Sequence, residues 1–347
     1  MDKKVIFLKD SEINEWLIQG FAQREFLINF MGIKNPSRML SASRIIRILA
    51  LHSRYLKLSF KALFQSQKDD IMVCFLDVVG LYVFLLSKLL CKKRYIVPLN
   101  IMYNDRKDII TTLKRLLFRV MLKRSTVYPT VNSEELSLIY RKVFNLPNKD
   151  FFVLHDCYGK LEKYKKPFRE GNNTVFCGGT NGRDWNTIIQ TARLLPNVKF
   201  VVIGPSKNTF GDNVPSNIKY YHNTPFLEFQ RLMEESSVLA LPLDTEAPAG
   251  LIVLFTAGLM SKPVVTTNNI TMREYIQPGI NGLFVGMGNY ESFAKQIDFL
   301  LSNKDKQREF GEKLYYQIEK LGAPLVFVDG IINIINFIIK NENSSNK

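Results

Sequence analysis

The segment 245–267, TEAPAGLIVLFTAGLMSKPVVTT, contains residue types that suit an anion-binding site. Small residues at Ala249 and Gly250 precede a run of largely apolar residues at 251–260, which is long enough for a buried helix, and Pro248 suits the first turn of that helix. A bare helix start presents unpaired N–H groups and the positive end of the helix dipole, so it can hold a phosphate. The same small residues also suit a helix that packs closely against its neighbours. The segment alone leaves both interpretations open.

Apolar runs and amphipathic segments alternate along both halves of the chain, as expected of strands and helices. A polar, charged stretch at 155–173 separates the two halves. We therefore predict an α/β protein of two doubly wound domains, 1–160 and 161–347, whose last helix could pack back on the first domain. The expected strands are 3–9, 71–77, 94–100, 174–179, 199–204, 219–223, 238–243 and 264–266. The expected helices are 41–64, 111–125, 184–195, 224–237, 251–260, 289–303 and 324–340, and 126–144 reads as a strand and then a helix capped at Asn132 or Ser133.

The excess positive charge lies almost wholly in the first half. Residues 1–160 hold 27 Lys and Arg against 14 Asp and Glu, whereas residues 161–347 hold 20 against 18. A basic half suits an anionic membrane, a phosphorylated substrate or nucleic acid. We expect no nucleic-acid partner, because no recognition motif is present and the aromatic residues of this half fit a core. A solvated basic face without a partner is the remaining alternative.

Two segments of the basic half, 41–64 and 111–125, combine apolar and basic residues at helical spacing. Such helices suit an anionic membrane surface. No secretory signal opens the chain and the four cysteines show no CxxC spacing, which favours the cytosol and excludes a structural zinc. We expect a cytoplasmic protein, bound peripherally to the inner face of the membrane. The predicted membrane contacts are Lys114, Arg115, Arg119, Lys123 and Arg124.

Residues 71–91 approach the length of a membrane span. Asp77, Gly80 and Lys88 interrupt the apolar run, and an acid followed closely by a glycine is typical of a strand, a turn and a helix. We predict that arrangement rather than a span.

The second half resembles the nucleotide-sugar domain of the GT-B glycosyltransferases, family 4 in particular. The resemblance rests on several short segments in a fixed order. They are FCGG (176–179) followed by Arg183, VVIG (201–204), VLALPLDTEAPAGL (238–251), KPVVTT (262–267) and EYIQPGINGLFV (274–285). The first half is similar only as a doubly wound domain with VNSEEL (131–136) near its end. The architecture that the resemblance implies is two Rossmann-like domains facing a central cleft.

In the resembling enzymes the diphosphate of the donor lies over a glycine-containing loop and a helix start, and a nearby acid binds the transferred sugar. Carried over to this sequence, Arg183 would neutralise phosphate charge and Glu246 would hold the sugar. The alternatives are a surface cap for Arg183 and a solvated loop residue for Glu246. The implied donor is a UDP- or GDP-linked sugar. The donor-site prediction comprises Gly178, Gly179, Arg183, Gly204, Ala249, Gly250, Leu251 and Thr256.

This sequence departs from the family 4 pattern at two places. The family has a second Glu eight positions after the first, which usually holds the ribose. Counting from Glu246 gives Leu254, and aligning backward from Lys262 gives Thr256, so the ribose contact would come from Thr256 or from the backbone. The lysine–glycine pair of the family is replaced by Arg183 and Asp184. These departures indicate a divergent branch.

Asp77 is the first choice for the catalytic residue of the first half. The family often places a His or Asp at a strand end of this domain, and Asp77 closes the run IMVCFLD. It would deprotonate the acceptor hydroxyl or orient the sugars, with a helix cap as the structural alternative. His52 and His222 fit structural roles, and His155 is a further candidate near the linker. Neither an Asp-x-Asp motif nor a His/Cys cluster appears, so we expect no required metal and no cofactor.

The resemblance implies a glycosyltransferase that moves a sugar from a nucleotide donor to a saccharide acceptor. The basic half would suit an acceptor linked to polyprenyl pyrophosphate, as in polysaccharide assembly. A catalytically silent GT-B-like subunit that binds sugar or protein is the alternative, because the second acid is missing. A sugar-nucleotide epimerase of the same fold would have little use for a basic membrane face.

Overall fold

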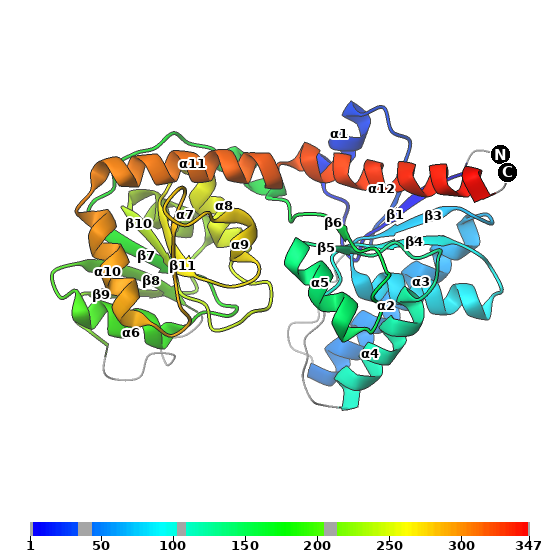
Figure 1. Ribbon diagram of the computed structural model, residues 1–347, viewed down its shortest axis with the longest axis horizontal. Coiled ribbons are helices and arrows are strands. Elements are labelled where there is room, and N and C mark those ends of the chain that lie inside the picture. Colours follow the sequence, from blue (N-terminus) through cyan, green and yellow to red (C-terminus); the bar gives the residue numbers. More distant parts are fainter. Residues whose placement is uncertain (1–2, 34–43, 103–108, 205–213, 346–347) are drawn as a thin grey trace. The chain divides into compact units, whose positions relative to one another are not determined.

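The computed structural model describes residues 3–33, 44–102, 109–204 and 214–345. The chain divides into two compact units (Figure 1). Unit 1 consists of Met1–His155 and Pro324–Lys347, and unit 2 consists of Asp156–Ala323. The division falls a few residues before the boundary expected at 160, and it assigns the last helix to unit 1.

Unit 1 contains a parallel sheet of strand order β2-β1-β3-β4. Helices α2, α3 and α4 cover one face of this sheet, and α1 and α12 lie on the other (Figure 1). Every residue of β1, β3 and β4 is buried, as expected of strands covered on both faces. The elements are β1 (Val5–Leu8), α1 (Glu15–Gln23), β2 (Asn29–Met31), α2 (Arg44–Gln65), β3 (Ile71–Cys74), α3 (Asp77–Leu89), β4 (Tyr95–Pro98), α4 (Ile109–Leu122), β5 (Thr130–Val131), α5 (Glu134–Val143), β6 (Phe152–Val153) and α12 (Pro324–Ser345).

Two local expectations for unit 1 are confirmed. The apolar run 71–91 forms strand β3 and helix α3. Helix α5 is capped by Ser133, whose Oγ accepts a hydrogen bond from the amide of Leu136 at 3.1 Å.

One stretch of the described residues, Lys304–Ser344, is long and apolar enough to cross a membrane by length and composition. Its apolar part lies in α12, where Val328, Ile331 and Ile335 are fully buried. A helix that packs on a core passes the same test, so length and composition alone do not assign a span here.

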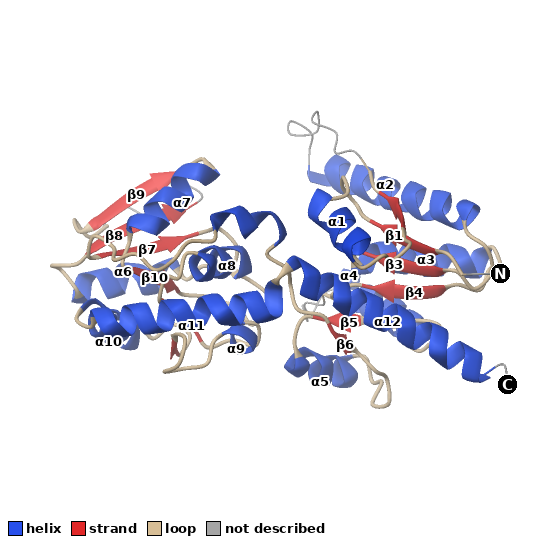
Figure 2. Ribbon diagram, turned by 90° about the horizontal axis from the view of Figure 1, so that it is seen from above, coloured by secondary structure: helices blue, strands red, loops and turns tan. Residues whose placement is uncertain are grey.

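Unit 2 contains a parallel six-stranded sheet of order β12-β11-β10-β7-β8-β9. Renumbered within the unit, this is the order 3-2-1-4-5-6 of a dinucleotide-binding fold, with β7 as its first strand. Strands β9, β8, β7 and β10 of this sheet lie side by side in Figure 2. The elements are the 3₁₀ helix η1 (Gly159–Tyr164), β7 (Thr174–Gly178), α6 (Trp185–Leu194), β8 (Lys199–Gly204), β9 (Ile218–His222), α7 (Phe226–Glu235), β10 (Val238–Leu241), α8 (Leu251–Leu259), β11 (Val264–Thr267), α9 (Met272–Tyr275), β12 (Leu283–Val285), α10 (Tyr290–Leu301) and α11 (Lys304–Gly322).

The strands of unit 2 divide their side chains between two apolar cores. Phe176 of β7 joins the core formed with α7, α8 and α11, whereas its neighbours Val175 and Cys177 join the core formed with α6 and α10. Successive residues of a strand point to opposite faces, so a sheet covered on both faces needs apolar residues at every position. This explains the continuous apolar runs in the sequence.

The prediction of two closing helices was wrong, because the structure has three. Helix α11 lies between α10 and α12 and was missed in the sequence. It is rich in charge, and its buried apolar residues form only a narrow stripe that includes Phe310, Leu314 and Ile318. The short edge strand β2 was missed as well.

Candidate functional site

The site of unit 2 lies where the winding of its sheet reverses. Strands β7 and β10 are neighbours in the sheet, but their following connections lead toward opposite edges. In such sheets, ligands bind at the carboxyl ends of these two strands. Gly178 ends β7 and Gly179 follows it, and the loop 242–250 follows β10. The structure therefore brings together two segments that the sequence separates by more than sixty residues.

Arg183 connects the two segments. Its backbone forms an antiparallel bridge with Leu243 in the loop after β10. Its Nε donates to the carbonyl of Gly178 at 2.8 Å, and its Nη1 donates to the carbonyl of Asn181 at 3.0 Å. A Cβ on Gly179 would lie 2.5 Å from Nη2, so the guanidinium packs directly on this glycine.

The charge of Arg183 is buried without a matching acid. Arg183 is 6% exposed, and within the described residues no carboxylate lies within 4.0 Å of its guanidinium. Burial lowers the pKa of Arg183, and the more distant Cys177 and Asp244 oppose that shift. Arginine still keeps its charge at neutral pH. The alternative of a surface cap is wrong, and an unbalanced buried cation is what an anionic ligand would neutralise.

Helix α8 begins beside this arginine. Gly250 is its N-cap residue, with φ of +81°, and no side chain caps the helix. A Cβ on Gly250 would lie 3.4 Å from Nη1 of Arg183. The bare helix start and the guanidinium therefore adjoin each other, and both present positive charge. The expected position of Pro248 in the first turn was wrong, because the helix begins at Leu251.

Polar contacts hold the loop 242–250 in place. The amide of Asp244 donates to the carbonyl of Gly182 at 3.2 Å. The side chain of Asn269, which is fully buried after β11, donates to the carbonyl of Thr245 at 2.9 Å. Glu246 is exposed, and its Oε2 accepts from the amide of Ile270 at 3.1 Å. Asn269 was missed in the sequence, where it follows the run KPVVTT as an ordinary loop residue.

One of the predicted donor-site residues, Thr256, lies apart from the group formed by Arg183 and Gly250. Thr256 is fully buried on α8, and its hydroxyl donates to the carbonyl of Ile252 at 2.7 Å. The prediction of a ribose contact from its side chain is therefore wrong, and the other aligned position, Leu254, is fully buried as well. Gly204 ends β8 beside the end of β7, where the amide of Gly179 donates to the carbonyl of Ile203 at 3.1 Å, and it packs near Tyr220 and Trp185.

Asp77 occupies the first turn of α3 in unit 1, after the carboxyl end of β3. It is not the N-cap, which is Leu76. Its side chain is 9% exposed, and its two oxygens accept from the amides of Val78 at 2.7 Å and Met102 at 3.1 Å. Burial raises the pKa of Asp77, and Lys114, whose Nζ lies 3.9 Å from Oδ2, opposes that shift. These contacts hold the backbone at Met102, and the catalytic role stays a prediction.

The basic helix α4 divides its residues between a buried face and an exposed one. Nζ of Lys114 lies 3.9 Å from Oδ2 of Asp77 and over the ring of Phe118, and the Lys114 side chain remains 37% exposed. Phe118 and Met121 are buried. The exposed apolar residues form a stripe at helical spacing. They are Ile109, Leu113, Leu116 and Val120.

The histidines show no catalytic grouping. Nδ1 of His52 lies 3.0 Å from the hydroxyl of Tyr82, and His222 stacks on Tyr220. His155 is half-buried at the end of unit 1. In the part of the chain that the structure describes, no three His, Cys, Asp or Glu side chains are grouped as metal ligands.

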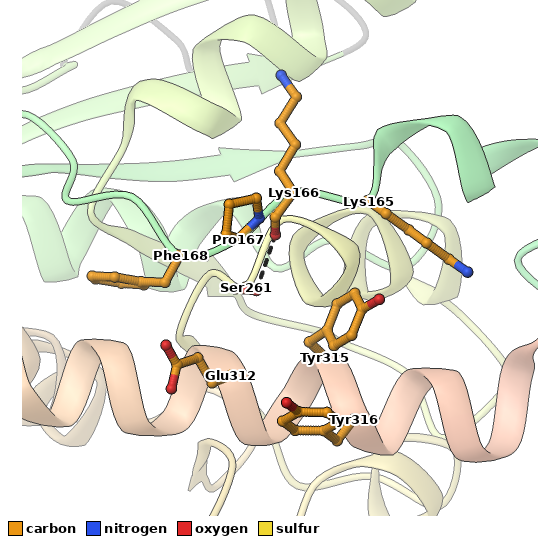
Figure 3. Close-up of a pocket in the computed structure, with 8 residues that line it drawn as sticks. All are labelled: Lys165, Lys166, Pro167, Phe168, Ser261, Glu312, Tyr315 and Tyr316. Atoms are coloured by element: carbon orange, nitrogen blue, oxygen red, sulfur yellow. Dashed lines mark hydrogen bonds between the residues drawn. The ribbon is translucent and has the colours of Figure 1, made fainter.

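A surface pocket of about 370 Å³ lies at the opposite end of α8 from Gly250 (Figure 3). Its lining comes from 165–168, Ser261 and helix α11, and includes Tyr315 and Tyr316. The amino groups of its two lysines point away from it (Figure 3), and they pair with glutamates. None of the predicted site residues line this pocket.

The comparisons with known proteins agree with this architecture. Residues 175–303, within unit 2, match the family model for "Glycosyl transferases group 1". A search of curated protein sequences found no significant match. Similar solved structures cover nearly the whole chain at low identity, and their two-domain GT-B fold is the fold of this chain.

Three of these structures illustrate the likeness. Sucrose-phosphate synthase from Thermosynechococcus elongatus has a TM-score of 0.75 at 10% identity and covers 98% of this chain and 100% of its own. The Anabaena protein HepE in complex with UDP has a TM-score of 0.66 at 12% identity, with coverages of 96% and 99%. The lipopolysaccharide outer core galactosyltransferase WaaB has a TM-score of 0.63 at 15% identity, with coverages of 96% and 99%.

Proposed function

We propose that this protein, a glycosyltransferase with the GT-B fold, moves a sugar from a nucleoside-diphosphate donor to a saccharide acceptor at an anionic membrane surface. The donor is held by unit 2. The acceptor is held by unit 1 and is carried on a polyprenyl pyrophosphate, as in polysaccharide assembly. The protein acts in the cytoplasm, peripherally bound to the inner face of the membrane.

The main support for a donor site in unit 2 is that Arg183 lies next to the uncapped N-terminus of α8. A buried guanidinium that no carboxylate of the described residues pairs with and an uncapped helix start both favour a dianion between them. The nucleoside diphosphate leaves with negative charge, and fixed positive groups stabilise it in the transition state. The Anabaena neighbour binds UDP, which supports a UDP-linked donor over a GDP-linked one.

We propose that the reaction needs no metal ion and no cofactor. In metal-dependent transferases a divalent cation neutralises the leaving diphosphate. Here Arg183 and the amides of α8 supply that positive charge.

Glu246 is proposed to hold the transferred sugar. Its carboxylate is exposed beside the start of α8, and one of its oxygens accepts from Ile270. The other oxygen is free to accept from a sugar hydroxyl. On the acceptor side, Asp77 is proposed as the base or orienting group, and its raised pKa favours proton acceptance.

The membrane surface is proposed to be the outer side of α2 and α4. The two helices flank α3 on one face of the unit 1 sheet (Figure 1). The exposed stripe of α4 lies among Arg115, Arg119 and Lys123. Helix α2 has its own exposed apolar residues, including Ile45 and Leu49. Basic residues attract an anionic bilayer while apolar side chains insert, which gives reversible binding.

A matched pair of glycine variants tests the donor site. Gly250→Ala and Gly279→Ala both place alanine at a positive φ, +81° and +77°. A Cβ at Gly279 meets open space, whereas one at Gly250 meets Arg183 and Leu241. The left-handed backbone should cost each variant about 1–2 kcal/mol of stability, and the close contacts should add to the loss in Gly250→Ala. Only Gly250→Ala should weaken UDP binding measured by calorimetry, by roughly tenfold or more.

The same UDP titrations in the presence of EDTA test the proposal that no metal ion is needed. Binding that disappears with EDTA would contradict it. UDP binding without transfer from any nucleotide sugar would favour the silent subunit, and no binding of UDP or GDP would overturn the proposed donor site.

A further inference from the structure

A cavity of about 530 Å³ opens in unit 1 where α3 ends and β4 begins. It lies at the amino end of the parallel strands, whereas Asp77 lies at their carboxyl end, at the other end of α3. At 1.5 Å per residue, the cavity side chains at the end of α3 are about 15 Å along the helix from Asp77. The cavity is therefore separate from the proposed catalytic residue.

Five cations line this cavity: Lys88, Lys92, Lys93, Arg94 and Arg124. Among the residues that the structure describes, only Lys93 of the five has a carboxylate within 4.0 Å, Asp69 at 3.1 Å. The nearby Asp70 already accepts from the backbone amides of Lys4 and Gln67. The positive charge around the cavity therefore exceeds the negative charge.

Arg94 shows how this charge is held. It is 3% exposed, and its guanidinium donates to Oγ and the carbonyl of Ser66, both at 2.9 Å, and to the carbonyl of Lys93 at 2.7 Å. These acceptors are neutral, so they orient the guanidinium without cancelling its charge. Burial lowers the pKa of Arg94, with Asp70 and Asp69 opposing, and the guanidinium stays charged.

Ser87 gives an independent sign of a missing ligand. It lines the cavity from the last turns of α3, is 7% exposed, and its hydroxyl has no hydrogen-bond partner within the described part of the chain. A buried hydroxyl without a partner is destabilising. An acceptor oxygen of a ligand in the cavity would satisfy it.

We propose that this cavity binds the phosphate groups of an anionic ligand, with Lys88, Arg124 and the Ser87 hydroxyl among its contacts. Phosphate oxygens accept from all three groups, and the fork of arginine matches phosphate geometry. Exposed apolar side chains adjoin the cations, because Nζ of Lys92 lies 5.4 Å from the ring centre of Phe64 and Leu89 is exposed on the last turn of α3. The phosphate belongs either to a lipid headgroup or to a soluble ligand.

Calorimetry with inorganic diphosphate tests the site, with UDP added to occupy any donor site in unit 2. The double variant Lys88→Ala/Arg124→Ala removes two cavity cations. The control Lys199→Ala/Lys295→Ala removes two exposed charges from unit 2. The control should bind diphosphate like the natural protein, and the cavity variant should bind it roughly thirtyfold more weakly or worse. No binding by the natural protein, or equal binding by all three proteins, overturns the proposal.

Ser87→Ala tests the role of the hydroxyl. Because the hydroxyl has no partner among the described residues, its removal should leave the thermal midpoint unchanged or raise it, while diphosphate binds several-fold more weakly. A lower midpoint with unchanged affinity would show that Ser87 is only structural, and would remove it from the site.

Vesicles distinguish the two sources of phosphate. Sedimentation is compared for phosphatidylcholine vesicles that contain phosphatidic acid or phosphatidylserine at equal surface charge. A lipid site predicts a preference for phosphatidic acid that soluble diphosphate removes and that the cavity variant lacks. A soluble ligand predicts no such preference, with the difference in diphosphate binding retained. These outcomes concern unit 1 alone, so they stand apart from the UDP titrations that test the donor site.

Discussion

Replacing Arg183 with methionine separates a binding role from a structural one. Methionine is long, unbranched and apolar, so it fills the volume of the arginine stem without the charge. The change removes two hydrogen bonds, to the carbonyls of Gly178 and Asn181, worth about 1.5–3 kcal/mol each for a charged donor. It also removes the desolvation cost of a buried ion, which is several kcal/mol.

These two contributions nearly cancel, so the free energy of unfolding of Arg183→Met should change by less than about 2 kcal/mol. For a unit of this size, that corresponds to a shift of the thermal midpoint of less than roughly 8 °C. Nucleotide binding has no such compensation. The loss of a charged contact to the diphosphate should weaken UDP binding by about 1.5–3 kcal/mol, or roughly 10- to 150-fold.

Differential scanning calorimetry and isothermal titration with UDP measure the two quantities on the same preparation. Arg183→Lys is the matched control, because it keeps the charge and loses the fork, and it should retain part of the affinity. A folded Arg183→Met protein that binds UDP as well as the natural protein would refute the assignment. A collapse of the thermal midpoint in both variants would show that Arg183 mainly supports the turn after β7.

Three further predictions follow from the site and the charges. Glu246→Gln should lower the rate of sugar transfer by tenfold or more while UDP affinity stays within about twofold, since the acid contacts the sugar. An equal loss of transfer rate and of UDP affinity would indicate that Glu246 contacts the nucleotide instead. Burial lowers the pKa of Lys149 and of Lys262 to about 8, so the native state binds fewer protons than the unfolded state. The free energy of unfolding should therefore rise from about pH 8 to pH 10.5, by up to roughly 3 kcal/mol for each lysine. Urea unfolding between pH 8 and pH 10.5 should show a smaller rise in the free energy of unfolding for Lys262→Met than for the natural protein. A free energy of unfolding that falls with pH in the natural protein would contradict the lowered pKa values. Reversal of Arg115, Arg119 and Lys123 to Glu should abolish sedimentation with anionic vesicles while UDP binding remains, whereas extraction only by detergent would indicate a membrane span.

The order of elements in unit 2 could be read from the sequence because it depends on local patterns. The continuous apolar runs at β7, β8 and β10 report strands buried on both faces. The small residues before Leu251 mark the helix start at the predicted residue, because a backbone with φ of +81° strongly favours glycine. Helix α11 could not be recognised in this way, because a charged helix that buries only a narrow apolar stripe shows little periodicity of apolar residues in its sequence.

The tertiary structure alone decided which residues meet. Arg183 adjoins Gly250 because β7 and β10 pair in the sheet, and strand order depends on packing between segments far apart in the chain. Thr256 and Lys114 carry the expected chemistry, but the rotation of their helices turns the first into the core and the second toward Asp77. A sequence pattern gives the period of a helix, whereas the neighbours that bury one of its faces determine which polar groups reach a ligand.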